Sequence, residues 1–388
     1  MIIRQELLFS FEELQKFEPK SKLEVLFENL DLTPCLEKLK RLPGRPPYPR
    51  AAMLRALIAQ RLLSIPTFSA LAERLQYDLH FRYACGFDVC HSTPSVSAFS
   101  RFFKNLSRCD GLLSLFHSLA QQCLESGLAD GDVLAIDSSA LHAHEKPWPK
   151  DQHPHDGQWA EWGHKKDSHG KPMTWYGYKV HAAVDAGSGL PMAMTVTPAN
   201  EADSVEAIPL MEQSPSPADY YCMDKGYDAK RIYEKAVGMG GQAVIPLNLR
   251  NEKELPEGLS RTRTPVCSMG YEMPYWGCDK KAGTLKFRCP HVLGKVDCPQ
   301  GSNWCSSSDY GCVVKKHVAD DPRSFCLPHR GSREWKKLYN LRSSAERLFS
   351  RGKEKLGLDN IRLRGRAKVT AHSLLCGITV LASAIALQ

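Results

Sequence analysis

Val133-Leu134-Ala135-Ile136-Asp137 is a short apolar run that ends in an aspartate. Such a run predicts a buried strand. Strands and helices alternate downstream, with strands predicted over residues 176–185, 191–197, 219–223 and 242–247 and helices over 203–212 and 228–237. This order, β-β-β-α-β-α-β, predicts an α/β domain with a mixed five-stranded sheet and flanking helices. The first and fourth strands can then lie side by side, while the polar stretch 141–174 is predicted to be a loop.

The regions on either side of this sheet differ in character. Residues 1–130 are predicted to form an all-α domain, in which Thr93-Pro94 is a helix start. Its short helices fit a helix-turn-helix DNA-binding domain or a plain helical bundle, and the sequence alone favours the bundle. A Cys-rich insertion, 248–332, separates residues 131–247 from the C-terminal part, 333–388, which completes the sheet domain with an amphipathic helix over 334–356.

Composition and charge narrow the function classes. The chain has 388 residues, 43% hydrophobic and 24% charged, which excludes a largely disordered protein, a collagen and a coiled coil. The net charge is +8, and residues 333–368, with twelve basic and four acidic side chains, carry all of it. This local excess favours a phosphate-rich partner. With no secretory signal, and with an apolar segment at 373–387 that is short for a membrane span, we expect a cytoplasmic protein with reduced thiols.

Three carboxylates stand out as a candidate site. Asp137 and Asp224 each end a predicted buried strand, although aspartate also starts turns for purely structural reasons. In the late helix, Tyr339, Arg342, Glu346 and Lys353 have offsets of 3, 4 and 7 and fall within an arc of about 60°. The alternative is a solvated face on which Arg342 and Glu346 form an i,i+4 pair. Arg347 and Arg351 are predicted to point the other way, towards solvent or DNA.

Two strand-end aspartates and a helix glutamate suit one chemistry well. Two divalent cations held about 3.5–4 Å apart by carboxylates can activate water and stabilise the leaving oxygen in phosphodiester hydrolysis. Mg²⁺ prefers such oxygen ligands. Three acids without a cation would repel one another, so metal binding also explains how the cluster is tolerated.

These residues and their neighbours resemble the DDE-type insertion-sequence transposases with the Y-x2-R-x3-E-x6-K signature. Tyr339, Arg342, Glu346 and Lys353 match that spacing. The stretches 135–139 and 224–228 resemble the motifs of the first and second catalytic aspartates. The stretches 176–185 and 197–203 resemble the second strand and the strand-to-helix junction of that family.

The resemblance implies an RNase H-like catalytic domain and a DNA-end-binding domain at residues 1–130. Asp137, Asp224 and Glu346 would bind two Mg²⁺ ions, which Mn²⁺ can replace, while Tyr339, Arg342 and Lys353 would hold phosphates. The expected reactions are hydrolytic cleavage at the transposon ends and strand transfer of the 3′-OH into target DNA. Expected partners are the terminal inverted repeats, target DNA and a second copy of the chain when ends are paired, with no membrane. The alternatives are an RNase H-like nuclease without strand transfer and an inactive DNA-binding regulator.

Further candidates come from the second strand and the insertion. Lys179 and His181 share a strand face, so they would line the site or touch DNA, or serve as a structural lysine and histidine. In the insertion, Trp276 and Trp304 are candidates to stack on a flipped base. Seven cysteines lie between Cys267 and Cys326, but none has the C-x2-C or C-x4-C spacing of a zinc knuckle, so this spacing favours small apolar side chains over a zinc site.

Overall fold

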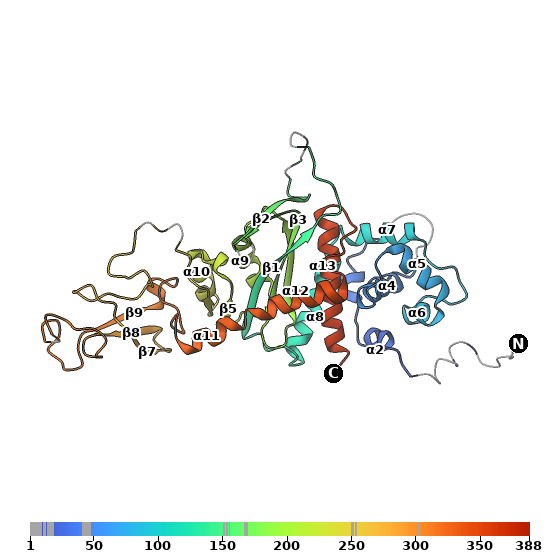
Figure 1. Cartoon of the computed structure of the whole chain (residues 1–388). Coiled ribbons are helices and arrows are strands. Elements are labelled where there is room, and N and C mark those ends of the chain that lie inside the picture. The colour runs from blue at the N-terminus through green and yellow to red at the C-terminus, as the bar shows by residue number, and fades with distance from the viewer. Residues whose placement is uncertain are drawn as a thin grey trace, which may run out of the picture.

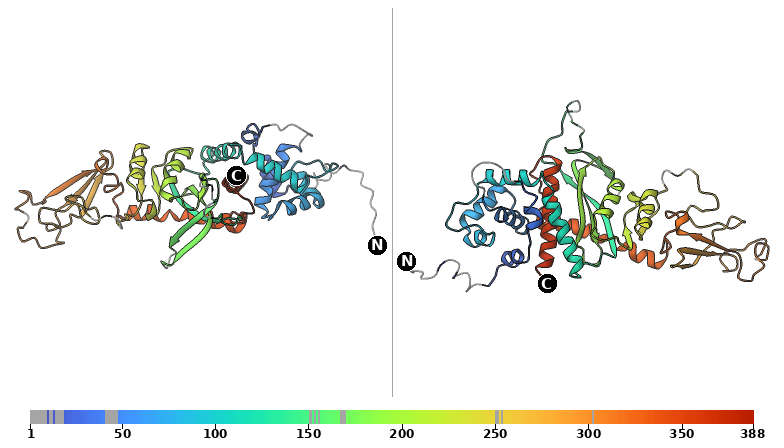
Figure 2. Two further views of the ribbon diagram at one scale, coloured as in Figure 1. Left: turned by 90° about the horizontal axis from the view of Figure 1, so that it is seen from above. Right: turned by 180° about the vertical axis from the view of Figure 1, so that it is seen from behind.

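The computed structural model describes the chain except for residues 1–9, 11, 12, 14–18, 41–47, 150, 151, 153, 155, 167–169, 250, 251, 253 and 302. Figures 1 and 2 show an elongated molecule in which N-terminal helices, a central sheet and the insertion follow one another along its length. Helix α13 (Arg366–Ile385) stands between the N-terminal helices and the sheet.

The N-terminal region is helical, as predicted. Its helices are α2 (Lys22–Glu28), α3 (Thr33–Leu36), α4 (Arg50–Leu62), α5 (Phe68–Tyr77), α6 (Leu79–Ala84), α7 (Val96–Leu106) and α8 (Gly111–Glu125). Side-chain oxygens cap four of the starts by accepting a backbone N–H, at Ser21, Thr67, Asp78 and Ser95. The helix expected to start at Thr93 therefore begins later, because the Ser95 hydroxyl accepts the N–H of Ala98 at 3.3 Å.

The central sheet is mixed, and it has six strands instead of the predicted five. They are β1 (Val133–His142), β2 (Glu161–Lys166), β3 (Pro172–Asp185), β4 (Pro191–Pro198), β5 (Tyr220–Cys222) and β6 (Gln242–Val244). The order is β2-β3-β1-β5-β6, and β4 also pairs with β3. β1, β3 and β4 form the predicted antiparallel meander, whereas β1, β5 and β6 run parallel. The predicted neighbours, strands one and four, are therefore adjacent as β1 and β5.

The unpredicted strand β2 pairs with the first half of β3, in the region predicted to be a loop. This hairpin projects beyond the main core, and Trp162 and Met173 are exposed. It is held by backbone pairing and by a close fit at Gly163, where an added Cβ would meet the Trp175 ring at 2.5 Å. Trp175 is buried, but Trp162 and Met173 are exposed, so the sequence shows no period-2 apolar pattern there.

The helices around the sheet are α9 (Asp203–Gln213), α10 (Lys230–Gly238), α11 (Arg333–Asn340) and α12 (Ser343–Leu356), with the short 3₁₀ helix η2 (Lys225–Tyr227) after β5. The single helix predicted over 334–356 is thus interrupted. The hydroxyls of Ser343 and Ser344 bond back to the carbonyls of Asn340 and Leu341, and backbone bonds there tighten to three-residue spacing. Both effects bend a helix.

Helix α13 matches the expectation of a buried core helix, although it is longer than the predicted segment. By length and composition its 20 residues could cross a membrane, but the share of its most apolar window buried inside the protein is 72%. It packs against β4, α4 and α8. Its apolar character is therefore used within the fold, between the N-terminal helices and the sheet (Figure 2).

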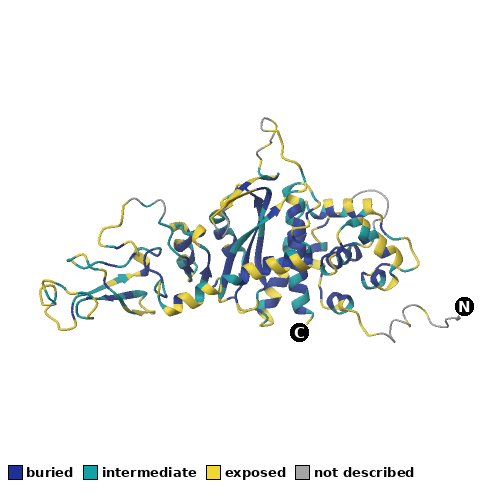
Figure 3. Cartoon of the chain, in the orientation of Figure 1, coloured by how far each residue is buried: buried dark blue, intermediate teal, exposed yellow. Residues whose placement is uncertain are grey.

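The insertion forms a separate small sheet of β7 (Tyr275–Asp279), β8 (Thr284–Arg288) and β9 (Val313–His317), followed by the 3₁₀ turn η3 (Val318–Asp320). Figure 3 shows that few of its residues are buried. Its buried apolar cluster, among the described residues, consists of Met273, Leu285, Phe287 and Phe325.

Candidate active site

Asp137 and Asp224 are brought together by the register of two parallel strands. Ala135 of β1 is paired with Cys222 of β5. Asp137 lies two residues after Ala135, and Asp224 lies two residues after Cys222. The parallel pairing stops at this point, since β1 continues beside β3 whereas β5 ends. Asp137 is therefore within β1 instead of at its end. The two carboxylates stand where the strands part, and this opening is where parallel sheets place functional groups.

Glu346 approaches the aspartates from α12, which packs on β1 and β3. Its link to them is Arg342, whose guanidinium lies 2.8 Å from the Glu346 carboxylate and 3.4 Å from that of Asp137. Half of the Glu346 side chain is exposed, at 53%, against 18% for Asp137. The site thus has a buried floor at Asp137 and an open side at Glu346.

The charge of this site is out of balance. The pKa of Asp137 is raised to about 6, mainly by burial and in addition by the nearby charges of Asp224 and Glu346. The Ser138 N–H, which donates to Asp137 at 2.8 Å, and the Arg342 guanidinium act in the opposite direction without cancelling the rise. The positive charge of one arginine is therefore too small to balance the negative charge of three carboxylates.

This excess of negative charge, together with an all-oxygen donor set, fits divalent cations. Within the described part of the chain, however, no three His, Cys, Asp or Glu side chains already stand together as a ready-made ion site. Arg342 bonds to two of the carboxylates in this conformation. Asp137, Asp224 and Glu346 are the residues that would hold Mg²⁺.

Tyr339 and Lys353 lie on either side of Glu346 along the α11–α12 segment. Tyr339 stacks on Trp335, with ring centroids 5.1 Å apart, and the Arg342 guanidinium lies 5.9 Å from the centroid of the Tyr339 ring. Lys353 donates to the carbonyl of Ala140 on β1 at 3.1 Å, and burial lowers its pKa. Tyr339 thus supports the arginine, and Lys353 holds α12 against β1 at the edge of the site.

Two predicted DNA contacts are engaged elsewhere. His181 is wholly buried, its Nε2 lies 2.8 Å from the Thr197 hydroxyl, and burial lowers its pKa to about 4. This placement favours the structural alternative for His181, and a DNA contact by this residue stays an untested prediction. Lys179 is 13% exposed and is bonded to Asp203 at 2.9 Å and to the Glu201 carbonyl at 2.7 Å. That ion pair fixes the junction between β4 and α9 instead of leaving a cation for phosphate.

Arg347 and Arg351 are exposed on α12, and Arg347 bonds within the helix to Ser343 at 2.8 Å. Trp276 and Trp304 are also exposed, at 48% and 56%. Trp276 lies on the sheet of the insertion, where the Arg288 guanidinium is 4.7 Å from its ring centroid. These placements keep all four side chains accessible to a partner.

Sequence reasoning missed two features near these residues. Tyr227, within the strand-end motif 224–228, is buried, and its pKa is raised well above its usual value, first by burial and then by Asp203, Asp137 and Asp224. Its place in the quoted motif was the available signal.

The second missed feature is a basic groove, a cavity of about 240 Å³ between the end of α7 and the start of α13. Five cations and no carboxylate line it, namely Lys104, Arg108, Arg364, Arg366 and Lys368. Arg366 bonds to the Val196 carbonyl at 2.8 Å, whereas the other four have no acidic partner among the described residues. The groove combines residues more than 250 positions apart, so no local pattern could indicate it.

Comparisons with known proteins follow the same division of the chain. A family model described as "Transposase DDE domain" matches residues 128–382, which include the sheet, the insertion and the three carboxylates. A second model, described as "Transposase domain (DUF772)", matches residues 11–105, within the N-terminal helices. No curated protein matches the chain.

Proposed function

The chain belongs to the family of transposases with a DDE domain, and from this premise we propose that it cuts DNA at the ends of its mobile element and joins the freed 3′-OH to target DNA. Membership indicates DNA transposition and DNA as the partner. The observation that carries the finer proposal is the alignment of Asp137 with Asp224 by the Ala135–Cys222 register, with Glu346 tied to Asp137 through Arg342.

Divalent ions bound by these carboxylates would supply an activated water and charge stabilisation at the leaving oxygen. Hydrolysis and strand transfer are both in-line attacks on a phosphodiester, first by water and then by the 3′-OH, so one set of carboxylates serves both. Arg342 is bound to two of the carboxylates in the described conformation, and cations held by these carboxylates would take its place. Its planar guanidinium then suits a bidentate contact with phosphate.

The DNA itself is proposed to contact basic side chains on both sides of the site. Arg347 and Arg351 on α12 are exposed, and the basic groove between α7 and α13 offers four cations without acidic partners among the described residues. A positively charged surface that has no carboxylates gains affinity by releasing counterions from DNA. We propose the element's terminal inverted repeats as the duplex bound, a homodimer when two ends are paired, and the cytoplasm as the place of action.

The decisive experiment uses a supercoiled plasmid that carries the gene with its own flanking DNA. The purified protein and Mg²⁺ are added, and every break and joint is mapped to the nucleotide. Wild type should break the DNA at inverted repeats that border the gene, Glu346→Gln should not, and Glu354→Gln should cut as wild type does. Glu354 is a suitable control because it is an exposed glutamate on the same helix, bonded to Ser350.

The products also separate the alternatives. Joining of cut 3′ ends to new DNA establishes strand transfer, whereas cuts without joints would leave a nuclease. Binding of the ends without cutting in Mg²⁺ or Mn²⁺ would contradict the three-carboxylate mechanism and favour a DNA-binding regulator.

A further inference from the structure

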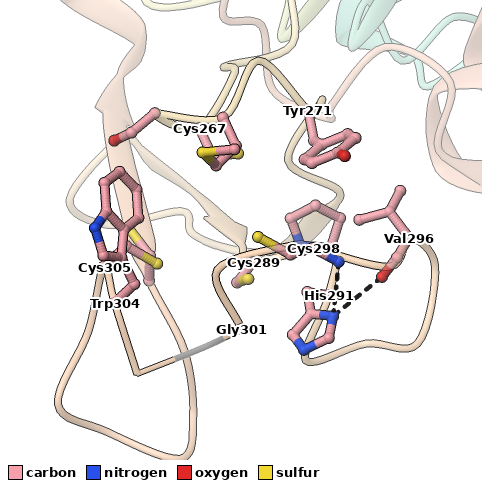
Figure 4. Close-up of a pocket in the computed structure, with 13 residues that line it drawn as sticks. Cys267, Tyr271, Cys289, His291, Val296, Cys298, Gly301, Trp304 and Cys305 are labelled. Carbon is pink, nitrogen blue, oxygen red and sulfur yellow. Dashed lines mark hydrogen bonds between the residues drawn. The ribbon is translucent and has the colours of Figure 1, made fainter.

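The insertion contains a pocket lined by sulfur. Its volume is about 20 Å³, room for about one water-sized particle. Five of the seven cysteines of the insertion line it, together with the ring of His291 and the exposed Trp304: Cys267, Cys289, Cys298, Cys305 and Cys312. Figure 4 shows Cys267, Cys289, Cys298 and Cys305 around one central space, brought there by separate segments of the insertion, and Cys312 completes the lining.

Two of the cysteines are fixed as neighbours by the small sheet. Cys289 directly follows β8 and Cys312 directly precedes β9, next to the paired residues Arg288 and Val313. The Cys289 N–H donates to the Cys312 carbonyl at 2.8 Å, which extends that pairing by one step. This cross-strand pair delivers two thiols to one place without any short spacing along the chain.

A tight turn brings the third thiol. The Gly270 N–H donates to the Cys267 carbonyl at 2.8 Å, and Gly270 adopts a positive φ of 79° that favours glycine. Cys267 and Cys312 both pack against the apolar cluster of the insertion. Cys305 lines the same pocket, and its side chain is hydrogen-bonded to that of Cys312.

Apolar burial within the insertion is small. Its cluster has four buried members among the described residues, with six partly buried apolar side chains packed against them, on a small sheet surrounded by loops. Small units with so little apolar burial generally need a disulfide or a metal ion to keep a fixed structure. All fourteen cysteines lie among the described residues and none forms a disulfide.

We propose that Cys267, Cys289, Cys305 and Cys312 bind one zinc ion that fixes the tip of the insertion. Four thiolates in tetrahedral arrangement are a common structural zinc site. Among the described residues no three of these thiols already stand at ligand positions, so binding draws them together. Each thiol releases its proton to solvent as the Zn–S bond forms, with no change of oxidation state.

The remaining two donors, His291 and Cys298, are bonded to each other. The Cys298 N–H donates to Nδ1 of His291 at 3.2 Å, and this bond holds the 291–298 loop instead of presenting the ring to the quartet. The spacing argument against zinc assumed that one knuckle supplies two thiolates. Here a cross-strand pair, a turn and a loop supply them, which spacing along the chain cannot reveal.

The test is the zinc content of the full-length protein, purified under reducing conditions and measured by elemental mass spectrometry. Wild type should hold about one zinc per chain. The double variant Cys289→Ser/Cys312→Ser should lose it, whereas Cys278→Ser and Cys298→Ser should keep it. Cys278 is an exposed cysteine on β7 outside the pocket, and Cys298 lines the pocket without belonging to the quartet. Zinc-free wild type, or equal zinc in the double variant, would overturn the proposal.

A second measurement tests the proposal even if the double variant does not fold. Metal-free wild type is titrated with Co²⁺, which takes the place of zinc and shows thiolate-to-cobalt absorption together with the visible bands of a tetrahedral ion. Both signals should appear at one equivalent in wild type, in Cys278→Ser and in Cys298→Ser, and zinc should abolish them. A spectrum of an octahedral ion, without thiolate absorption, would overturn the proposal even if the double variant is never obtained. Neither readout depends on DNA cleavage, so the outcome is independent of the proposed function.

Discussion

The least favourable charge that we identify in the active site is that of Asp137. Its carboxylate is buried beside Asp224 and Glu346, and a raised pKa of about 6 means that the folded protein disfavours the charged form. Sites that prepare for a metal in this way lower the stability of the metal-free protein. Removing the charge should therefore stabilise the fold while abolishing activity.

We predict that Asp137→Asn is more stable than wild type by about 1–3 kcal/mol when both are measured at pH 8 in the presence of a chelator. Each unit of pKa shift is worth about 1.4 kcal/mol of stability, and the loss of the Arg342 contact reduces the gain. The unperturbed pKa is 3.8. The loss of wild-type stability caused by the charged Asp137 is therefore complete above about pH 6 and disappears as the pH falls towards 4. Thermal unfolding at pH 8 and pH 4.5 checks this. A gain of the same size at both values would contradict it.

His181 gives a second prediction with the opposite pH dependence. Burial lowers the pKa of His181 from 6.5 to about 4, so the folded state favours the neutral ring. As the pH falls from about 6.5 to 4, the unfolded chain takes up a proton that the folded protein does not, and the folded protein loses stability. Through this residue wild type should lose about 2 kcal/mol between pH 7 and pH 5. His181→Asn, which cannot take up the proton, should flatten that part of the profile in urea unfolding.

The matched control for this experiment is His164→Asn, since His164 is an exposed histidine on the neighbouring hairpin. The profile of this variant should follow that of wild type. DNA binding by His181→Asn should be unchanged wherever the protein is folded. A selective loss of DNA affinity in this variant would support His181 as a DNA contact.

At the scale of elements, one buried ion pair joins the insertion to the sheet domain. Arg323, which precedes α11, donates to both oxygens of Asp228 at 2.6 and 3.0 Å and also pairs with Glu252. The Asp228 side chain is fully buried, and although burial alone raises its pKa, the bonds from Arg323, Asn248 and Tyr233 hold the pKa below its usual value. The charge is tolerated only while its partners remain.

We predict that Arg323→Met destabilises the protein by about 3–5 kcal/mol, because it leaves a buried carboxylate without its cation. Adding Asp228→Asn to that variant should recover part of the loss, and Arg261→Met, at an exposed arginine of the insertion, should cost little. Urea unfolding of the four proteins measures the coupling. Equal losses for Arg323→Met and Arg261→Met would show that this junction does not stabilise the fold.

The sequence predicts elements well where they cover the core. The apolar runs of β1, β4 and β5 were identifiable, and their order was sufficient to place β1 beside β5. Strand β2 and the first residues of β3 were missed because this part of the hairpin shows no period-2 apolar pattern, whereas the rest of β3 was predicted over 176–185. The break between α11 and α12 depends on serine hydroxyls that bond backwards, which helical periodicity does not register.

The same limit applies to the candidate site. Motif spacing was sufficient to select Asp137, Asp224 and Glu346 as candidates, because strand ends and helix faces are local properties. It also showed that Lys179 and His181 share a face, but period-2 alternation does not say which face is open. Thr197 and Asp203, the side chains that engage them, lie about 20 residues further on, in β4 and at the start of α9.

At the scale of the whole molecule, α13 connects the two halves. Arg61 of α4 bonds to Nδ1 of His372 at 3.1 Å, and Nε2 of the same ring lies 3.1 Å from the Gly357 carbonyl at the end of α12. Burial lowers the pKa of His372 to about 3, so the neutral ring can accept from Arg61 and donate to that carbonyl. The N-terminal helices and the Glu346 helix are thereby held in one arrangement, and the basic groove lies at the same junction.

This arrangement makes the groove a test of how DNA spans the protein. If a duplex follows it, Lys104 from the N-terminal region and Arg364 from the C-terminal region contact phosphates of the same molecule. We expect Lys104→Gln/Arg364→Gln to weaken binding of a terminal-repeat duplex and to reduce the slope of log affinity against log salt by about 1 for each cation removed. Lys281→Gln, at an exposed lysine of the insertion at the far end of the molecule, should leave the slope unchanged.

The sequence of the duplex separates the role of the groove from base recognition. Contacts to phosphate position DNA without reading it, so the loss should be of similar size on the terminal repeat and on a scrambled duplex. Affinity measured by fluorescence anisotropy at several salt concentrations gives both quantities. An unchanged salt slope in the double variant would place the DNA elsewhere, with Arg347 and Arg351 of α12 among the exposed cations that could bind it.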